Sequence, residues 1–426
     1  MAALIAVLAA GCVPAAGTPS AKPTTGGATL SATPTPTMTG LASPQPPGPV
    51  KAPPGTAPGP VAQGSLTPGE PVLAIERFDD PAIFGGPGRV SLRHAVSVGS
   101  GFVIVGDVWH VVGDTTGRAW LSPDGRSWER VDVPAMDRAF AVNDLAATPD
   151  GTLVANGIGS TADGFVVWSS PDGGRTWQKA KFTDIAGTMQ LGWVVGGPRG
   201  FLMVGWNSTV PARDGDTALW WSPDGQRWTR AEMPRNVFGD VSVSGIAATA
   251  SGFVAVGERW PAGVTSLRDA TPLERGVAWL SADGLRWSEA DVPDAAPPLV
   301  SVVVSGRAML ATAFRVTDTR VSWWRSDDGR VWEPDTASSQ LWAPNDSPMD
   351  FGWRDSLYQL GTSWRSGGPV GELWASEDGR TWRRIGATLE PQLGGIGGFL
   401  PGEPGILMRD ERNGAGSVRL ICWPAP

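Results

Sequence analysis

Eight aromatic and charged residues lie in or near the predicted loops between the second and third strands of several sequence repeats, where a ligand site could be built. Counting from the glycine that ends each predicted second strand, a tryptophan falls at the third position in three repeats, and in a fourth it follows the glycine directly. Exposed indoles can cover the apolar face of a sugar or peptide while charged groups fix its orientation. We therefore expect a glycan or protein site on the second-to-third-strand loops. The alternative is that the tryptophans pack between repeats and the charges are solvated. The eight residues are Trp109, His110, Trp206, Arg259, Trp260, Arg315, Trp364 and Arg365.

Catalytic chemistry has less support in the sequence. A Ser-His-Asp hydrolase is disfavoured, because His94 and His110 are the only histidines and no nucleophile-elbow motif accompanies them. No Cys/His cluster or calcium-binding loop predicts a metal site, and no cofactor is expected. A glycoside hydrolase that uses two carboxylates stays an alternative, because the same loops carry Asp107, Glu258, Asp269 and Glu274.

The elements that would position these residues come from a repeat. The motif Ser-x-Asp-Gly-x-x-Trp occurs six times, once with an extra residue, and its closing tryptophans lie 49, 51, 59, 45 and 50 residues apart. Self-similarity at such a period indicates a repeat architecture. The copies span residues 122–128, 170–177, 222–228, 281–287, 326–332 and 376–382.

Each copy predicts two strands joined by a tight turn. The Asp side chain can accept hydrogen bonds from the backbone N–H groups that follow it, and Gly can adopt the positive φ of a short hairpin. A tryptophan on each side of the turn can pack with its partner and fix the register of the hairpin. Tryptophans two residues before each motif are Trp120, Trp168, Trp220, Trp279, Trp324 and Trp374.

The six motifs resemble the Asp box of bacterial neuraminidase (BNR) repeats, whose pattern is Ser-x-Asp-x-Gly-x-Thr-Trp. The copy at 170–177 matches this pattern at full length, and the other five are one residue shorter. The resemblance implies a sialidase-like β-propeller, in which the box caps the third-to-fourth-strand hairpin and lies away from the active site. The aspartates given this structural role are Asp124, Asp172, Asp224, Asp283, Asp328 and Asp378.

The same resemblance implies sialidase as the enzymatic interpretation. That family binds the substrate carboxylate with three arginines and uses an Asp acid/base and a Tyr nucleophile paired with a Glu. Arg259, Arg315 and Arg365 could form such a cluster, although repetition alone gives them equivalent positions. The family's N-terminal Phe/Tyr-Arg-Ile-Pro motif is absent, and the only tyrosine, Tyr358, is predicted at a packing position within a strand. We therefore expect recognition without catalysis.

The fold class predicted for residues 71–426 is all-β, a propeller of four-stranded antiparallel blades. Six repeats are complete, and a seventh begins at 394–408 and continues at 417–423 without a box. Residues 72–78 can supply its missing outer strand and close the ring. We predict seven blades, with six as the alternative, and no helix.

The N-terminal residues predict a membrane anchor and a spacer. Residues 1–12 look like a lipoprotein signal peptide that ends in a lipobox, with Cys12 as the lipidated residue; the alternative is a short apolar leader. Residues 13–70 contain fourteen prolines and no aromatic residue, so they are predicted to be a disordered linker. The expected location is extracytoplasmic, anchored by lipid to a bacterial membrane.

The formal net charge of −8 argues against nucleic acid as a partner. With Cys12 assigned to lipidation, Cys422 is unpaired and is expected to be a small buried side chain. The function predicted is non-catalytic recognition of a glycan or envelope protein by a monomeric lipoprotein. A glycoside hydrolase and a scaffold or assembly factor for a cell-envelope complex are the alternatives.

Overall fold

The computed structural model describes residues 71–423 except 87, 112–113, 140, 160–163, 183–188, 208–216, 233–240, 261–274, 315–320, 343–347, 354, 366–367, 389–398, 403–404 and 411–416. By contacts, the chain divides into two units, residues 1–61 and 62–426, and the described residues belong to the second. Cys12 and the predicted linker at 13–70 lie outside the described residues. Within the described part, no helix is long and apolar enough to cross a membrane.

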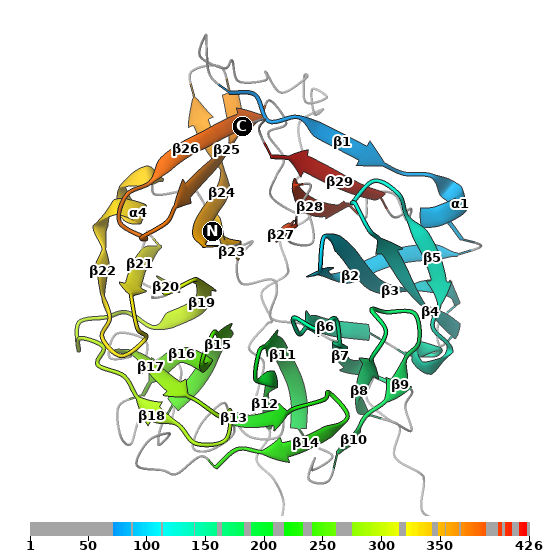
Figure 1. Ribbon diagram of the computed structural model, residues 1–426, viewed down its shortest axis with the longest axis horizontal. Coiled ribbons are helices and arrows are strands. Elements are labelled where there is room, and N and C mark those ends of the chain that lie inside the picture. Colours follow the sequence, from blue (N-terminus) through cyan, green and yellow to red (C-terminus); the bar gives the residue numbers. More distant parts are fainter. Residues whose placement is uncertain are drawn as a thin grey trace, which may run out of the picture. The chain divides into compact units, whose positions relative to one another are not determined.

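Seven four-stranded antiparallel units form the blades of a β-propeller, as the sequence predicted (Figure 1). Blade 1 contains β2 (Arg89–Val98), β3 (Gly101–Val111), β4 (Asp114–Ser122) and β5 (Glu129–Asp132), and blade 2 contains β6 (Ala141–Ala147), β7 (Leu153–Ile158), β8 (Phe165–Ser170) and β9 (Gln178–Lys179). Blade 3 contains β11 (Met189–Gly197), β12 (Gly200–Asn207), β13 (Thr217–Ser222) and β14 (Arg227–Arg230), and blade 4 contains β15 (Val241–Thr249), β16 (Gly252–Arg259), β17 (Arg275–Ser281) and β18 (Ser288–Glu289).

Blade 5 contains β19 (Leu299–Ser305), β20 (Ala308–Ala313), β21 (Ser322–Ser326) and β22 (Glu333–Asp335). Blade 6 contains β23 (Met349–Trp353), β24 (Ser356–Arg365), β25 (Gly368–Ser376) and β26 (Arg383–Thr388). Blade 7 contains β27 (Phe399–Pro401), β28 (Gly405–Asp410), β29 (Ser417–Cys422) and β1 (Ile75–Phe78). One further strand, β10 (Lys181–Phe182), leaves blade 2 and pairs in parallel with β14 of blade 3.

The two ends of the propeller meet in blade 7, which makes the six-bladed alternative wrong. Strand β1 pairs antiparallel with β29, from Ile75 opposite Ile421 to Phe78 opposite Val418, and forms the outer strand of the blade. The predicted strand at 72–78 is shorter in the structure, because Val72 turns away to form an isolated parallel bridge with Ala387 of blade 6. The pairing of β1 with β29 closes the ring and covers the edge that β29 would otherwise expose.

The core lies between the blades, where the first tryptophan of each repeat packs. Trp120, Trp168, Trp220 and Trp279 on the third strands are at most 1% exposed. The indole Nε1 of Trp120 donates to the Ile83 oxygen at 2.8 Å, and that of Trp168 donates to the Ala135 oxygen at 2.7 Å. Such burial removes large apolar surfaces from water and keeps neighbouring blades together.

Three short helices in the described part of the chain were not predicted from the sequence. They are α1 (Pro81–Phe84), the 3₁₀-helix η1 (Pro134–Met136) and α4 (Thr336–Leu341). Local caps, which leave little periodic signal, stabilise two of them: Asp80 accepts a hydrogen bond from the Ala82 N–H, and Asp335 accepts from Ala337 and Ser338. The helices cover blade edges and do not interrupt the ring.

All six Asp-Gly motifs have the same internal geometry. In each, the aspartate Oδ1 accepts hydrogen bonds from two following backbone N–H groups at 2.6–3.3 Å. The turn glycine has a φ between 65° and 95°. In five motifs the closing tryptophan Nε1 donates to the oxygen of this glycine at 2.9–3.3 Å.

These contacts set the charge state of the motif aspartates. Burial raises the pKa of the carboxyls and is the largest influence at Asp172, Asp224, Asp283 and Asp378, whereas backbone hydrogen bonds are the largest at Asp124 and Asp328. The hydrogen bonds together outweigh burial, and each pKa lies below its usual value. The six carboxylates therefore serve as turn caps.

Candidate functional site

Most of the predicted site residues lie on strands, not on the expected loops. Trp109 and His110 belong to β3, Trp206 to β12, Arg259 to β16, and Trp364 and Arg365 to β24. The reason is that second and third strands continue to pair beyond the glycine taken as the strand end, for example Trp109 opposite Thr115. Arg315 lies outside the described residues, as do the side chains of Trp206, Trp364 and Arg365.

On blade 4 the predicted residues are engaged by the protein itself. Trp260 is only 5% exposed, so the expectation of an exposed indole fails there. Arg259 forms a two-point ion pair with Glu289, with Nη1 to Oε1 at 2.6 Å and Nη2 to Oε2 at 2.8 Å. Neither side chain is poised for a ligand in this structure.

Blade 1 carries a pocket that contains one of the predicted residues. Arg89, Ser91, Arg93 and Trp109 line a cavity of about 210 Å³. In the pairing of β2 with β3, Arg89 lies opposite Trp109 and Ser91 opposite Asp107. Because side chains alternate across a strand, these four point to one side of the sheet.

The other face of the same two strands is apolar. Val90, Leu92 and Val108 pack there against Leu407 and Leu420 of blade 7. The polar face is thus held in place by a packed core behind it. A register shift between Leu92 and His94 makes Arg93 the extra residue of a bulge, a feature that often redirects a side chain.

The charges of the pocket are unequal. Arg93 Nε lies 2.8 Å from Asp107 Oδ1, and its guanidinium carbon lies 5.9 Å from the centre of the Trp109 ring. Arg89 is exposed and has no ion-pair partner among the described residues. One acidic group therefore faces two basic groups, which favours an anionic ligand.

Two buried polar atoms beside the pocket lack a hydrogen-bond partner among the described residues: Asp107 Oδ2 and Trp109 Nε1. Burial raises the pKa of the Asp107 carboxyl, against the lowering effect of the Arg93 hydrogen bond. Leaving a buried polar group without a partner is costly, and a ligand that bonds these two atoms would remove that cost.

Neighbouring contacts fix the inner strands around the pocket. His94 Nδ1 lies 3.3 Å from Asp144 Oδ1 of blade 2, and Asp144 Oδ2 accepts from the Val194 N–H of blade 3 at 2.8 Å. The exposed His110 has its Nε2 3.2 Å from Thr116 Oγ1. These interactions join three blades and leave little freedom to the strand that carries Arg93.

Sequence reasoning found Trp109 but missed Arg89, Ser91 and Arg93. Their signal is the alternation of polar residues at 89, 91 and 93 with apolar residues at 90 and 92, which marks a first strand with one polar face. Only strand pairing reveals that this face adjoins Trp109.

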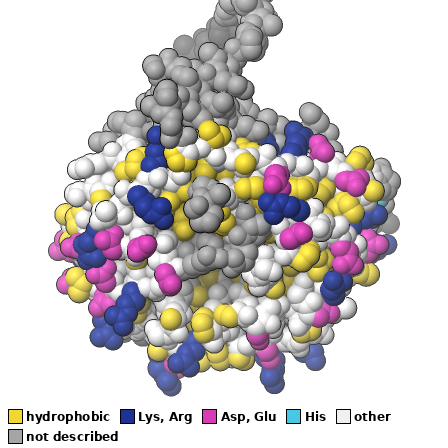
Figure 2. All heavy atoms as spheres, turned by 45° about the horizontal axis from the view of Figure 1, so that its top comes forward, with side chains coloured by type: hydrophobic (Ala, Val, Ile, Leu, Met, Phe, Trp, Pro, Cys, Tyr) yellow, Lys and Arg dark blue, Asp and Glu magenta, His cyan; other side chains and the backbone are white. Residues whose placement is uncertain are grey.

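Across the described residues, no group of three or more His, Cys, Asp or Glu side chains could hold a metal ion. Basic and acidic side chains are interspersed on the face seen in Figure 2, without a large area of one sign. Tyr358 stacks on Phe351 at 5.3 Å between ring centres and lies 5.3 Å from Trp423, in the packing position that the sequence predicted.

Comparisons with known proteins show a shared architecture only. No protein-family model matches the chain, and no curated protein matches it. Among solved structures, the β-propeller domain of the Trilobed protease from Pyrococcus furiosus has 10% sequence identity and a TM-score of 0.49, over 75% of this chain and 91% of that chain.

Two further solved structures are similar to this extent. A PL25 polysaccharide lyase, an ulvan lyase bound to -[GlcA(1-4)Rha3S]-, has 10% identity and a TM-score of 0.49, over 79% of this chain and 94% of that chain. YCF48 bound to a D1 peptide has 11% identity and a TM-score of 0.45, over 83% and 99%. Likeness at this level gives no family or ligand for this chain, and the fold assignment rests on its own strand pairing.

Proposed function

We propose that the propeller is a non-catalytic recognition module that binds an acidic glycan at the blade 1 pocket. The observation that carries this proposal is the convergence of Arg89, Arg93 and Trp109 on one cavity. A guanidinium binds a carboxylate with two parallel hydrogen bonds, and an indole covers the apolar face of a sugar ring. The pocket combines both.

The two arginines would have different roles. Arg93 is oriented by Asp107 and by the Trp109 ring, so it is held before a ligand arrives. Arg89 is exposed and would supply the uncompensated positive charge. Because Arg93 is already ordered, its side chain loses less conformational entropy on binding than an unrestrained arginine would.

Catalytic alternatives have less support. The lining of the blade 1 pocket includes no carboxylate, and Asp107 beside it is paired with Arg93. The packing of Tyr358 against Phe351 and Trp423 removes it as a nucleophile. An acidic peptide of an envelope protein also fits two arginines and an aromatic ring, so a protein ligand or a scaffold role in an envelope complex stays the second candidate.

We also propose that the chain is an Asp-box propeller displayed as a lipoprotein. The common hydrogen bonding of the six motifs supports the first part. The lipobox-like residues before Cys12 and the proline-rich stretch at 13–70 support an extracytoplasmic anchor and stalk. Metabolic labelling with a clickable fatty acid tests this part: Cys12→Ser should abolish the label, and a label that persists would contradict it.

Binding to an array of acidic and neutral glycans tests the recognition function. The purified full-length chain is compared with Arg89→Ala and with Arg199→Ala, a matched control at an exposed turn arginine outside the pocket. We expect acidic glycans to bind, with about tenfold weaker binding by Arg89→Ala, unchanged binding by Arg199→Ala, and weakening by salt. Equal effects of the two variants, or binding of acidic peptides but no glycan, would contradict the glycan assignment.

A further inference from the structure

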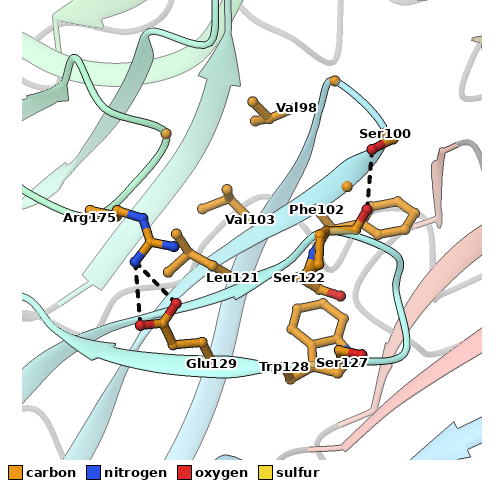
Figure 3. A pocket seen from close by; sticks show the side chains of 14 residues that line it. Val98, Ser100, Phe102, Val103, Leu121, Ser122, Ser127, Trp128, Glu129 and Arg175 are labelled. Atoms are coloured by element: carbon orange, nitrogen blue, oxygen red, sulfur yellow. Dashed lines mark hydrogen bonds and ion pairs between the residues drawn. The ribbon is translucent and has the colours of Figure 1, made fainter.

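A larger cavity lies between blades 1 and 2, among the Asp-Gly motifs. Its walls come from the β2–β3 turn, the motif of blade 1 and the motif of blade 2, and it encloses about 600 Å³ (Figure 3). This volume falls within the range of small-ligand sites. None of the residues considered above for recognition belongs to it.

One side of this cavity is apolar. Val98, Val103, Leu121 and Trp128 line it, and the indole of Trp128 is half-buried. Trp128 is held from two directions: its Nε1 donates to the Gly125 oxygen at 3.0 Å, and Phe84 contacts it edge-on with ring centres 5.6 Å apart. It therefore offers a fixed aromatic surface.

Polar residues of two blades complete the lining. Arg175 Nη1 of the blade 2 motif lies 3.1 Å from Glu129 Oε2 of β5 in blade 1 (Figure 3). More than half of each side chain is exposed, so further donors on the guanidinium and lone pairs on the carboxylate face solvent. The two charges cancel, which removes any preference for an ionic ligand.

A fixed aromatic surface in the same cavity as a paired acceptor and donor matches the chemistry of a neutral sugar. The apolar C–H face of the ring packs on an indole, while vicinal hydroxyls donate to a carboxylate and accept from a guanidinium. The hydroxyl of Ser127 lies in the same lining and adds a third polar group.

The cavity is more than a by-product of the repeat. Between blades 4 and 5, the equivalent turn and motifs enclose about 820 Å³, lined among others by Phe253, Leu280 and Arg330. There the motif tryptophan, Trp287, is 8% exposed and does not line the cavity, and Ser288 stands in the place of Glu129. Repetition thus produces the cavity, whereas the cavity between blades 4 and 5 lacks the tryptophan surface and the carboxylate at the position of Glu129.

We propose that the cavity between blades 1 and 2 is a second binding site, which takes a neutral oligosaccharide. It lies apart from the blade 1 pocket and differs from it in the charge of its ligand. A propeller with both sites would hold two parts of one polysaccharide, or two chains.

Isothermal titration of the full-length chain with neutral oligosaccharides tests the proposal, using cellohexaose, xylohexaose, maltohexaose and mannohexaose as probes. Arg175→Ala is the test variant. Arg380→Ala is its matched control, since Arg380 holds the equivalent motif position and pairs with Asp327 of the preceding blade at 2.7 Å. Both side chains are exposed, so both variants are expected to fold.

We expect at least one probe to bind and to bind about tenfold more weakly to Arg175→Ala, with no change for Arg380→Ala or Arg89→Ala. Trp128→Phe should weaken the same probe, because a smaller ring covers less of the sugar. Absence of binding by all four probes, or equal losses in Arg175→Ala and Arg380→Ala, would overturn the second site. Because Arg89→Ala reports on the first pocket alone, failure of one proposal is distinguishable from failure of the other.

Discussion

Replacing the glycine of one Asp-Gly motif should destabilise the propeller by an amount that the structure sets. Gly225 has a φ of +72°, and a Cβ added there would lie 2.4 Å from Val154 Cγ2 of the neighbouring blade. Val154 is wholly buried and cannot move aside cheaply. A left-handed non-glycine residue costs about 1–2 kcal/mol and overpacking about 1–3 kcal/mol, so Gly225→Ala should cost about 2–5 kcal/mol.

Gly173 provides the matched control. It has a φ of +69° in the motif of blade 2, but a Cβ added there would meet no atom within 4 Å. Gly173→Ala should therefore cost only the backbone term of about 1–2 kcal/mol. The two variants share a conformation and differ in the space beside it.

Calorimetric melting of the full-length chain and both variants measures the difference. An unfolding entropy of about 2.1 cal/mol/K per residue means that about 1 kcal/mol shifts the Tm of a propeller this large by about 1.5 °C. Gly225→Ala should lower Tm by about 3–7 °C and Gly173→Ala by about 1–3 °C. Equal shifts, or a larger shift for Gly173→Ala, would refute the packing of this motif against the neighbouring blade.

Three further perturbations follow from the structure. The pKa of the Asp224 carboxyl lies below its usual 3.8, so the stability that the carboxylate contributes is fully present above pH 3.8 and is lost as the pH falls through the lower pKa of the folded state. The urea midpoint of the parent chain should therefore drop more steeply below about pH 4 than that of Asp224→Asn. Leu73 is 2% exposed and Val72 is 64% exposed. In chemical denaturation, Leu73→Ala should therefore lower the free energy of unfolding by about 2–4 kcal/mol and Val72→Ala should leave it almost unchanged. Equal losses would contradict the packing of the N-terminal segment in the ring. Cys422 is half-buried, not buried as the sequence predicted. Its partial burial raises the pKa of the thiol, so its reaction with iodoacetamide at pH 8 should be slower in the native chain than in urea, and equal rates would contradict this effect.

The sequence predicted the parts of the fold that local interactions determine. Each Asp-Gly turn is specified within seven or eight residues. The aspartate accepts hydrogen bonds from the backbone N–H groups that follow the glycine, and the closing tryptophan donates to the glycine oxygen. Ring closure was also predictable. The C-terminal repeat lacks an Asp-Gly motif and a fourth strand, and the N-terminal segment at 72–78 is a strand without a blade, so each supplies the partner that the other needs.

The candidate site was only partly predictable, because it depends on contacts between strands. Trp109 was recognised from its place in the repeat, but Arg89 and Arg93 join it through the pairing of β2 with β3 and the bulge at Arg93. Trp260 has the same place in its repeat and is buried, since packing differs between blades that share a pattern. Equivalent positions in a repeat share a backbone and not an environment.

The most direct test of the recognition site is the indole ¹H–¹⁵N spectrum of the full-length chain, titrated with the strongest acidic glycan of the array. The Trp109 signal is assigned from its loss in Trp109→Phe. We predict that this signal shifts with saturation while the signals of Trp177 and Trp228 in the motifs stay in place. An unmoved Trp109 signal in the presence of bound acidic glycan would contradict the assignment of the blade 1 pocket as the recognition site.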